Sequence, residues 1–207
     1  MRLKNVKGAS KVINQCDLVI KNPENYKGEY QKIFKNDNPI HLEIGMGKGD
    51  FIINMAKTFP NINFIGIEMY DSVLVRAVEK IKEDIPNLIF IKIDAVNIED
   101  IFAKEIDMIY LNFSDPWPKN RHENRRLTSP RFLKRYDSIF KNKKTIIQKT
   151  DNRHLFEYSL KTLTDYNYKI KQISLDLHQE DIFNIETEYE KKFSSKGYPI
   201  YMLEAVK

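Results

Sequence analysis

From residue 39 onward, short runs rich in β-branched and aromatic residues alternate with segments whose apolar residues recur every three or four positions. This alternation is typical of a parallel sheet with helical crossovers. Residues 176–198, between the last two runs, have no helical pattern, so those runs should pair as an antiparallel hairpin. We therefore predict an α/β fold: a doubly wound sheet of seven strands with an antiparallel C-terminal hairpin. The expected strands are His41–Ile44, Asn63–Ile67, Leu88–Ile93, Met108–Phe113, Thr145–Gln148, Tyr168–Leu175 and Ile200–Ala205.

The clearest helical pattern is Asp71–Asp84, in which apolar residues recur on one side and charged residues occupy the other. Ser129 followed by Pro130 marks another helix start, because serine suits the N-cap and proline suits the first turn. The expected helices are Asp50–Phe59, Asp71–Asp84, Ile98–Lys104, Pro130–Phe140 and Arg153–Thr164.

Residues 1–37 are polar and rich in lysine, and they show no sustained apolar period. We expect a basic N-terminal arm, partly flexible, that lies across the domain or stays mobile until a partner binds. The length of 207 residues suits one substantial core, so residues 38–207 are expected to form a single domain.

The stretch "HLEIGMGKGDFI" joins the first expected strand to the first expected helix. Gly45 and Gly47 would let the chain turn tightly and approach a ligand at the edge of the sheet. The spacing is G-x-G-x-G, which differs from the dinucleotide-binding pattern G-x-G-x-x-G. A glycine loop can also be a purely structural turn, so neighbouring residues must decide what it binds.

Three acids stand at the ends of the first three expected strands: Glu43, Glu68 and Asp94. Glu68 is either an ordinary acid before a helix or an acceptor for both ribose hydroxyls of a nucleoside. Asp94 could face an adenine amino group. Glu43 would repel a pyrophosphate but attract a cationic amino-acid group, which favours S-adenosylmethionine over a nicotinamide dinucleotide.

Residues 111–126, "LNFSDPWPKNRHENRR", place Asp115 and the only tryptophan at the end of the fourth expected strand. Trp117 either stacks on a base or plugs the loop. From Lys119 to Arg135 there are seven basic residues and one acidic residue, a net charge of +6 that exceeds the chain's total of +5. Such a run is either a solvated face or a phosphate-binding surface, and its position directly behind Asp115 favours phosphate.

Three motifs resemble the bacterial tRNA (guanine-N7)-methyltransferases: "FSDPWPKNRHENRRL" after the fourth strand, "KTDNRHLF" at 149–156 and "TEYE" at 187–190. The resemblance is collinear from about Asn38 to the C-terminus. It implies a Rossmann-like methyltransferase sheet, S-adenosyl-L-methionine as cofactor, and a guanine of the tRNA variable loop, conventional position 46, as target. Asn120, Asn124 and Met46 depart mildly from the family pattern.

The resemblance also implies roles for individual residues. Asp115 is the implied catalytic residue, and the arginines from Arg121 to Arg126 form the implied RNA-contacting run. Asp151 suits either substrate binding or the N-cap of the next helix, and the two roles are compatible. The expected cofactor-binding residues are Glu43, Gly45, Gly47, Glu68, Asp94 and Asp115, and the expected substrate-binding residues are Lys119, Arg121, Arg125, Arg126, Asp151, Thr187, Glu188, Tyr189 and Glu190.

Guanine N7 carries an in-plane lone pair and no proton, so its methylation requires no general base. We therefore expect Asp115 to position the guanine and to stabilise the positive charge that develops on the ring, without accepting a proton.

The remaining features limit the compartment and the partners. The single Cys16 excludes an internal disulfide, no spacing indicates a metal site, and no run approaches the roughly 20 apolar residues that span a bilayer. No secretory signal is evident at the N-terminus. We expect a cytoplasmic protein with tRNA as partner, no membrane contact and no obligate protein partner, as a monomer or homodimer.

Three other functions remain open from the residues alone. An S-adenosylmethionine-dependent enzyme that methylates an exocyclic amine of a base, or a protein side chain, would share the acid, proline and aromatic residue at 115–117, but its reaction must release a proton. An RNA-docking module with a vestigial cofactor pocket would keep the basic run. A nicotinamide-dependent oxidoreductase lacks the expected glycine spacing.

Overall fold

The computed structural model describes residues 6–207, and in them seven strands form one mixed sheet in the order β3-β2-β1-β4-β5-β7-β6. The first five strands pair in parallel, and β7 runs antiparallel between β5 and β6. The predicted doubly wound sheet and its antiparallel C-terminal pair are thus confirmed. The strands are β1 (Ile40–Ile44), β2 (Asn63–Glu68), β3 (Leu88–Lys92), β4 (Ile106–Asn112), β5 (Phe140–Thr150), β6 (Lys169–Ser174) and β7 (Tyr201–Val206).

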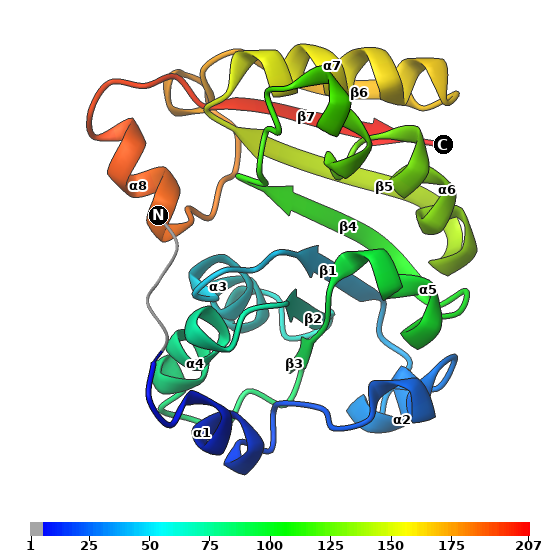
Figure 1. Ribbon diagram of the computed structural model, residues 1–207, viewed down its shortest axis with the longest axis vertical. Helices are drawn as coiled ribbons and strands as arrows, with labels where there is room; N and C mark the ends of the chain where they lie inside the picture. Colours follow the sequence, from blue (N-terminus) through cyan, green and yellow to red (C-terminus); the bar gives the residue numbers. More distant parts are fainter. Residues whose placement is uncertain (1–5) are drawn as a thin grey trace.

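Helices cover both faces of the sheet (Figure 1). On one face α1, α3 and α4 enclose an apolar cluster that includes Phe51, Phe64 and Phe90. On the other face α2, α5, α6 and α7 enclose a second cluster. The helices are α1 (Ala9–Gln15), α2 (Tyr30–Phe34), α3 (Asp50–Thr58), α4 (Asp71–Lys80), α5 (Ile98–Ile101), α6 (Pro130–Ile139), α7 (Arg153–Asp165) and α8 (Glu188–Ser194).

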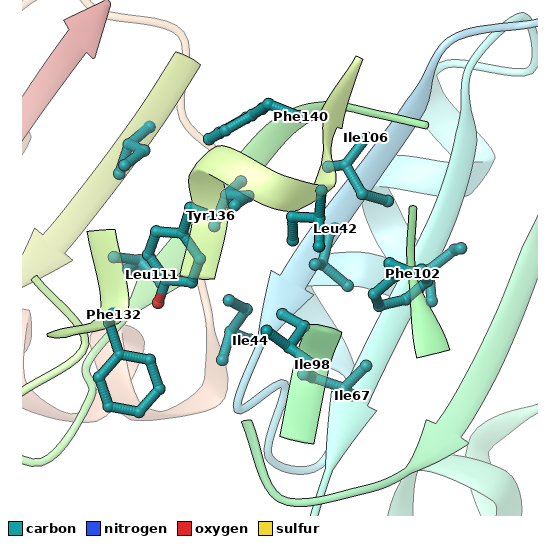
Figure 2. Packing of buried hydrophobic residues seen from close by; sticks show 14 of the residues in the cluster. Leu42, Ile44, Ile67, Ile98, Phe102, Ile106, Leu111, Phe132, Tyr136 and Phe140 are labelled. Carbon is teal, nitrogen blue, oxygen red and sulfur yellow. The ribbon is translucent and has the colours of Figure 1, made fainter. Parts of the chain in front are cut away.

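The strands at the centre of the sheet are buried on both faces, as expected for a parallel sheet between helical layers. All five residues of β1 and all six of β2 are buried. Figure 2 shows Leu42 and Ile44 of β1 and Leu111 of β4 among the buried apolar residues, with Phe132 and Tyr136 of α6 in the same cluster. This packing makes the sheet a rigid support for the segments that follow each strand.

The segment before β1 packs on the rest of the fold over its described residues. Tyr30 is completely buried and Phe34 nearly so, and Ile13 of α1 lies in the core beside α4. The Glu105 carboxylate accepts hydrogen bonds from the backbone N–H groups of Gly28, over 2.9 Å, and Tyr30, over 3.2 Å. Residues 1–5 of the expected arm lie outside the described residues.

The expectation that residues 176–198 contain no helix is wrong. A 3₁₀ helix spans Leu177–Gln179, and α8 occupies Glu188–Ser194. Thr187 and Glu190 form a capping box at the start of α8, and this T-x-x-E pattern is the sequence signal that identifies the helix.

The helix expected at Asp71–Asp84 ends earlier, at Lys80. Two acidic residues, Glu83 and Asp84, would stand at the negative end of a longer helix, and Pro86 disfavours helical geometry in the residue before it. The expected helix at Ile98–Lys104 is likewise shorter and ends at Ile101.

Candidate active site

A cleft of about 600 Å³ lies where β1, β2, β3 and β4 end. Ligands of open α/β sheets bind in this crevice, outside the carboxyl ends of the strands. The residues that follow each of these strands form the wall of the cleft. Residues singled out from the sequence that lie on this wall are Gly45, Glu68, Asp94, Asp115, Trp117 and Arg125.

Residues 45–49 turn the chain from β1 into α3 with three glycines in the left-handed region. The φ angles are +75° at Gly45, +58° at Gly47 and +78° at Gly49, which residues with a Cβ rarely adopt. A Cβ added to Gly49 would also lie only 2.8 Å from the Cβ of Ala77 on α4, whereas one added to Gly45 or Gly47 would meet no atom within 4 Å. Gly49 therefore allows α3 to pack on α4, while the other two glycines border open space.

Two of the expected cofactor-binding acids are held in place by the backbone. The Glu68 carboxylate accepts three backbone N–H hydrogen bonds, two at 2.9 and 3.0 Å from the residues that follow it and one at 3.2 Å from Gly47. Burial raises the pKa of Glu68. Asp94 accepts from the Val96 N–H over 3.0 Å and thereby caps the 3₁₀ helix at Ala95–Asn97. Both side chains also line the cleft, so they are fixed and still accessible to a ligand.

Glu43 is enclosed beneath the glycine loop and is 1% exposed. One carboxylate oxygen accepts a hydrogen bond from the Asn112 side-chain amide over 2.8 Å, but the other oxygen has no partner among the described residues. The side-chain oxygens of Asn112 and Ser114 are likewise buried and unpartnered in the described part of the chain. Burial raises the pKa of Glu43 to about 7, against the opposing effects of Asn112 and Lys149. Buried polar atoms without partners indicate that a polar ligand completes their hydrogen bonding.

Asp115 is exposed at the cleft wall, in the loop after β4. Two non-glycine residues flank it in the left-handed region: Phe113, with φ +50°, and Trp117, with φ +42°. Such angles are strained for residues with large side chains. The loop that presents Asp115 is therefore held in a conformation that it would not adopt in isolation.

Trp117 is half-buried and forms part of the cleft wall. The His122 ring lies edge-on to the indole at a centroid distance of 5.7 Å, and the Arg125 guanidinium carbon lies 4.9 Å from the centre of the indole ring. The side chain thus borders both the cleft and the basic run, and its ring already makes a cation–π contact.

The α8 segment closes one side of the site through contacts with three different elements. Lys48 of the glycine loop pairs with Glu188 over 2.5 Å. The Tyr189 hydroxyl donates to the Asp151 carboxylate over 3.1 Å, and the Tyr189 ring lies 5.0 Å from that of Phe113. Figure 1 shows α8 beside the edge of the sheet at which β4 and β5 end.

Asp151 does not cap α7, so the N-cap interpretation of this residue is wrong. Asn152 occupies the N-cap position, and its side-chain oxygen accepts from the Leu155 N–H over 2.8 Å. Asp151 instead accepts from the hydroxyl of Tyr189. Ser129 does stand at the N-cap position of α6, but its hydroxyl donates to the carbonyl of Asn124 over 3.2 Å and makes no capping bond.

Glu190 is completely buried, and its carboxylate binds residues of this chain. It pairs with Lys149 of β5 over 2.6 Å and accepts from the Asn184 side chain over 2.6 Å. Lys149 also donates to the Ile185 carbonyl over 2.9 Å, and burial lowers the pKa of Lys149. Sequence reasoning did not identify Lys149, although a lysine at the end of an apolar strand is a signal for a paired buried charge.

Lys119 and Arg121 are exposed, lie outside the cleft wall and form no ion pair with residues 6–207. Thr187 acts as the N-cap of α8. The structure therefore separates the predicted residues into a cleft wall, an exposed basic surface, and a third group on and around α8, of which Glu190 is buried. The site also contains three residues that are not among the expected site residues: Ser114, Asn112 and Lys149.

None of the helices within residues 6–207 has both the length and the apolar composition that a membrane span requires. The same residues hold no group of three or more His, Cys, Asp or Glu side chains arranged to bind a metal ion.

The fold is shared with methyltransferases of known structure. A 16S rRNA methyltransferase, KamB, has a TM-score of 0.66 at 11% identity, covering 86% of this chain and 92% of that one. An antibiotic-related methyltransferase has a TM-score of 0.64 at 19% identity, covering 87% and 92%. At these identities the likeness concerns the fold alone.

Residues 37–203 match the model of a family described as "Putative methyltransferase". A tRNA (guanine-N7)-methyltransferase of Listeria monocytogenes is 58% identical over 91% of this chain and 89% of its own length. The enzyme of the same name from Lachnoclostridium phytofermentans is 52% identical over 99% and 98%. The chain belongs to the bacterial tRNA (guanine-N7)-methyltransferase family.

Proposed function

We propose that this protein transfers a methyl group from S-adenosyl-L-methionine to N7 of a guanine in the tRNA variable loop, at conventional position 46. The observation that carries the proposal is that one cleft is lined by Glu68 and Asp94 together with Asp115 and Arg125. The names of the relatives support the same reaction, and the motif around Asp115 supports the nucleic-acid substrate.

The residues of the cleft fit S-adenosylmethionine. Glu68 and Asp94 offer acceptor oxygens for the ribose hydroxyls and the adenine amino group. Ser114 lines the cleft, and the enclosed Glu43, two residues before Gly45, adds a carboxylate with one oxygen that has no partner among the described residues. Both favour a cationic amino-acid group. When bound, the cofactor supplies an electrophilic methyl group on a sulfonium centre.

The chain contributes orientation and charge to this reaction. Guanine N7 has no proton to lose, so a general base is unnecessary. The Asp115 carboxylate can accept hydrogen bonds from guanine N1–H and the exocyclic amine, which fixes the ring, and it stabilises the positive charge of the N7-methylated product. Trp117 forms part of the cleft wall, where its indole would help to shield the reacting groups from water.

The exposed basic surface suits RNA phosphates. Arg121 and Arg125 lie on the 3₁₀ helix Asn120–Arg125, which follows Asp115 in the chain, with Lys119 immediately before it. Three exposed cations within seven residues favour an anionic partner. Asp151 and Tyr189 lie together at the side of the site and complete the proposed substrate-binding surface.

The direct test is incubation of the protein with unmodified tRNA and methyl-labelled S-adenosylmethionine, followed by mapping of the modified nucleoside. We expect N7-methylguanosine at position 46 and none in a matched tRNA that carries adenine there. A label on an exocyclic amine would support the rival amine methyltransferase. Cofactor and tRNA binding without transfer would support the docking module.

The raised pKa of Glu43, about 7, leads to a pH-dependent cofactor affinity. The neutral form predominates below pH 7 and cannot balance the ammonium group, so we expect the Kd for S-adenosylmethionine to rise as pH falls from 7.5 to 5.5. Isothermal titration at several pH values measures this. Glu43→Gln should bind more weakly with a flatter pH profile, and methylthioadenosine, which lacks the amino-acid group, should show little dependence. An unchanged wild-type profile would exclude the role of Glu43.

Arg121 and Arg125 should account for part of the salt dependence of tRNA binding. Each lost phosphate contact lowers the slope of log Kd against log salt by about 0.7 to 0.9. We therefore expect Arg121→Ala/Arg125→Ala to flatten the slope by about 1.5. The measurement is filter binding of tRNA between 50 and 300 mM KCl, with Arg153→Ala, an exposed arginine on α7 that pairs with Glu157, as the control. An unchanged slope in the double variant would show that neither arginine contacts phosphate.

A further inference from the structure

Arg126 differs from its basic neighbours because its side chain is directed at the backbone of the loop that carries Asp115. Its Nε donates to the carbonyl oxygen of Pro116 over 3.0 Å, and its Nη2 donates to that of Trp117 over 3.1 Å. Its guanidinium carbon also lies 4.2 Å from the centre of the Tyr158 ring on α7. The planar fork of arginine is therefore engaged at its edge by two carbonyls and at its face by an aromatic ring.

The loop requires such a restraint. Trp117 has a φ angle of +42° although it is neither glycine nor asparagine, and it precedes Pro118, which further restricts its backbone. Phe113, on the other side of Asp115, has a φ angle of +50°. A strained segment of this kind persists only where surrounding contacts hold it. The two carbonyls that Arg126 binds belong to the residues directly after Asp115.

We propose that Arg126 is a positioning residue that holds the 116–117 backbone so that the Asp115 carboxylate faces the cleft, and that it is not one of the RNA phosphate contacts. The proposal rests on the function proposed above and divides the basic run by role. Arg121 and Arg125 serve the RNA, whereas Arg126 serves the loop. Tyr158 contributes to the same restraint on the loop, since its ring covers the face of the Arg126 guanidinium.

Lysine in place of arginine separates the two roles. Lysine keeps the positive charge that a phosphate contact needs. Its ammonium group, however, cannot bind two carbonyls with a planar pair of N–H groups or stack flat on the Tyr158 ring. For Arg126→Lys we expect the salt dependence and the Kd of tRNA binding to stay within about twofold of wild type. The single-turnover rate of methyl transfer, with tRNA and S-adenosylmethionine both saturating, should fall at least tenfold. Arg76→Lys, at an arginine of α4 that pairs with Glu79 over 2.7 Å, is the matched control, and its saturated rate should fall less than threefold.

Two further variants test the same restraint of the 116–117 backbone. Arg126→Ala should lose rate at saturation as strongly as the lysine variant, again with an unchanged salt slope. Tyr158→Leu lies on α7 and retains Arg126, and it should lower the saturated rate in the same direction by a smaller factor. Circular dichroism will show whether the alanine variant folds. If it does not, the saturated rates and salt slopes of Arg126→Lys and Tyr158→Leu still test the positioning role of Arg126.

The only tryptophan of the chain provides a readout that does not depend on activity, because it lies in this loop. Release of the loop should make Trp117 fluorescence more accessible to acrylamide in Arg126→Lys than in wild type. A wild-type protein that methylates no guanine N7 would refute the proposed function, and the quenching would still test the restraint. A flatter salt slope with a normal saturated rate and normal quenching would make Arg126 a phosphate contact and overturn the inference.

Discussion

Replacement of Asp115 by alanine is expected to lower the saturated rate of guanine-N7 methylation by at least about 100-fold, the scale found when one electrostatic contact to a transition state is removed. The side chain is exposed at the cleft wall, where no residue of 6–207 pairs with its charge. It would therefore be available both to fix the guanine ring and to balance the charge that develops on it. The Kd for S-adenosylmethionine should rise only moderately, because Glu68 and Asp94 remain in place.

Asp115→Asn distinguishes the two contributions. Asparagine keeps one acceptor oxygen for the guanine but has no charge, so its rate should lie between those of wild type and the alanine variant. Single-turnover kinetics with labelled cofactor gives these rates, and equilibrium binding gives the two Kd values. Wild-type turnover in Asp115→Ala would remove this residue from the reaction. A loss that disappears at higher cofactor concentration would limit its role to binding.

Replacement of Lys149 by methionine is expected to lower the free energy of unfolding by about 3 to 5 kcal/mol, the usual cost of leaving one member of a buried ion pair uncompensated. The Lys149 side chain is 4% exposed and that of Glu190 is 0% exposed, and the two lie 2.6 Å apart. The variant would leave the Glu190 carboxylate buried with the His178 imidazole, 3.2 Å away and charged only when protonated, in place of its lysine partner. Urea denaturation followed by circular dichroism measures the effect.

The double variant Lys149→Met/Glu190→Gln is the matched comparison. Glutamine is neutral and keeps an acceptor for the Asn184 amide, so we expect the double variant to be more stable than Lys149→Met alone. Equal stability of the two variants would show that the charge of Glu190 is not the cause of the loss. Because Lys149 and Glu190 tie β5 to α8, the single variant should also weaken tRNA binding through Tyr189 and Asp151.

The strand tips could be anticipated from the sequence because their determinants are local. An apolar run, a glycine loop and a terminal acid predict β1 with Gly45 and Gly47, and the same reasoning placed Asp94 and Asp115 at the ends of their strands. Parallel strands bring their carboxyl ends to one edge, so residues that are far apart in the chain had to meet there.

Other parts of the site could not be anticipated because they depend on contacts between distant segments. Lys149 and Glu190 are 41 positions apart, and Arg126 meets Tyr158 across the gap between the basic run and α7. The burial of Tyr30 and Phe34 depends on α5, β4 and the neighbouring core, and no periodic pattern in the sequence predicts this burial. The helix α8 is an exception, since its capping box is a local signal that lies within four residues, Thr187 to Glu190.

The sequence by itself determined the order of the seven strands and of the helices from α3 to α7, the glycine loop and the acids around it, since hydrophobic periodicity and turn chemistry act over a few residues. Only the tertiary structure decided which charges face the cleft and which are buried. Glu190 of α8 is paired with Lys149 of β5, Glu43 retains an oxygen without a partner among the described residues, and Arg126 binds the loop of Asp115. The reason is physical: the state of a charged side chain depends on the dielectric and the partners around it, and these exist only once the chain has folded.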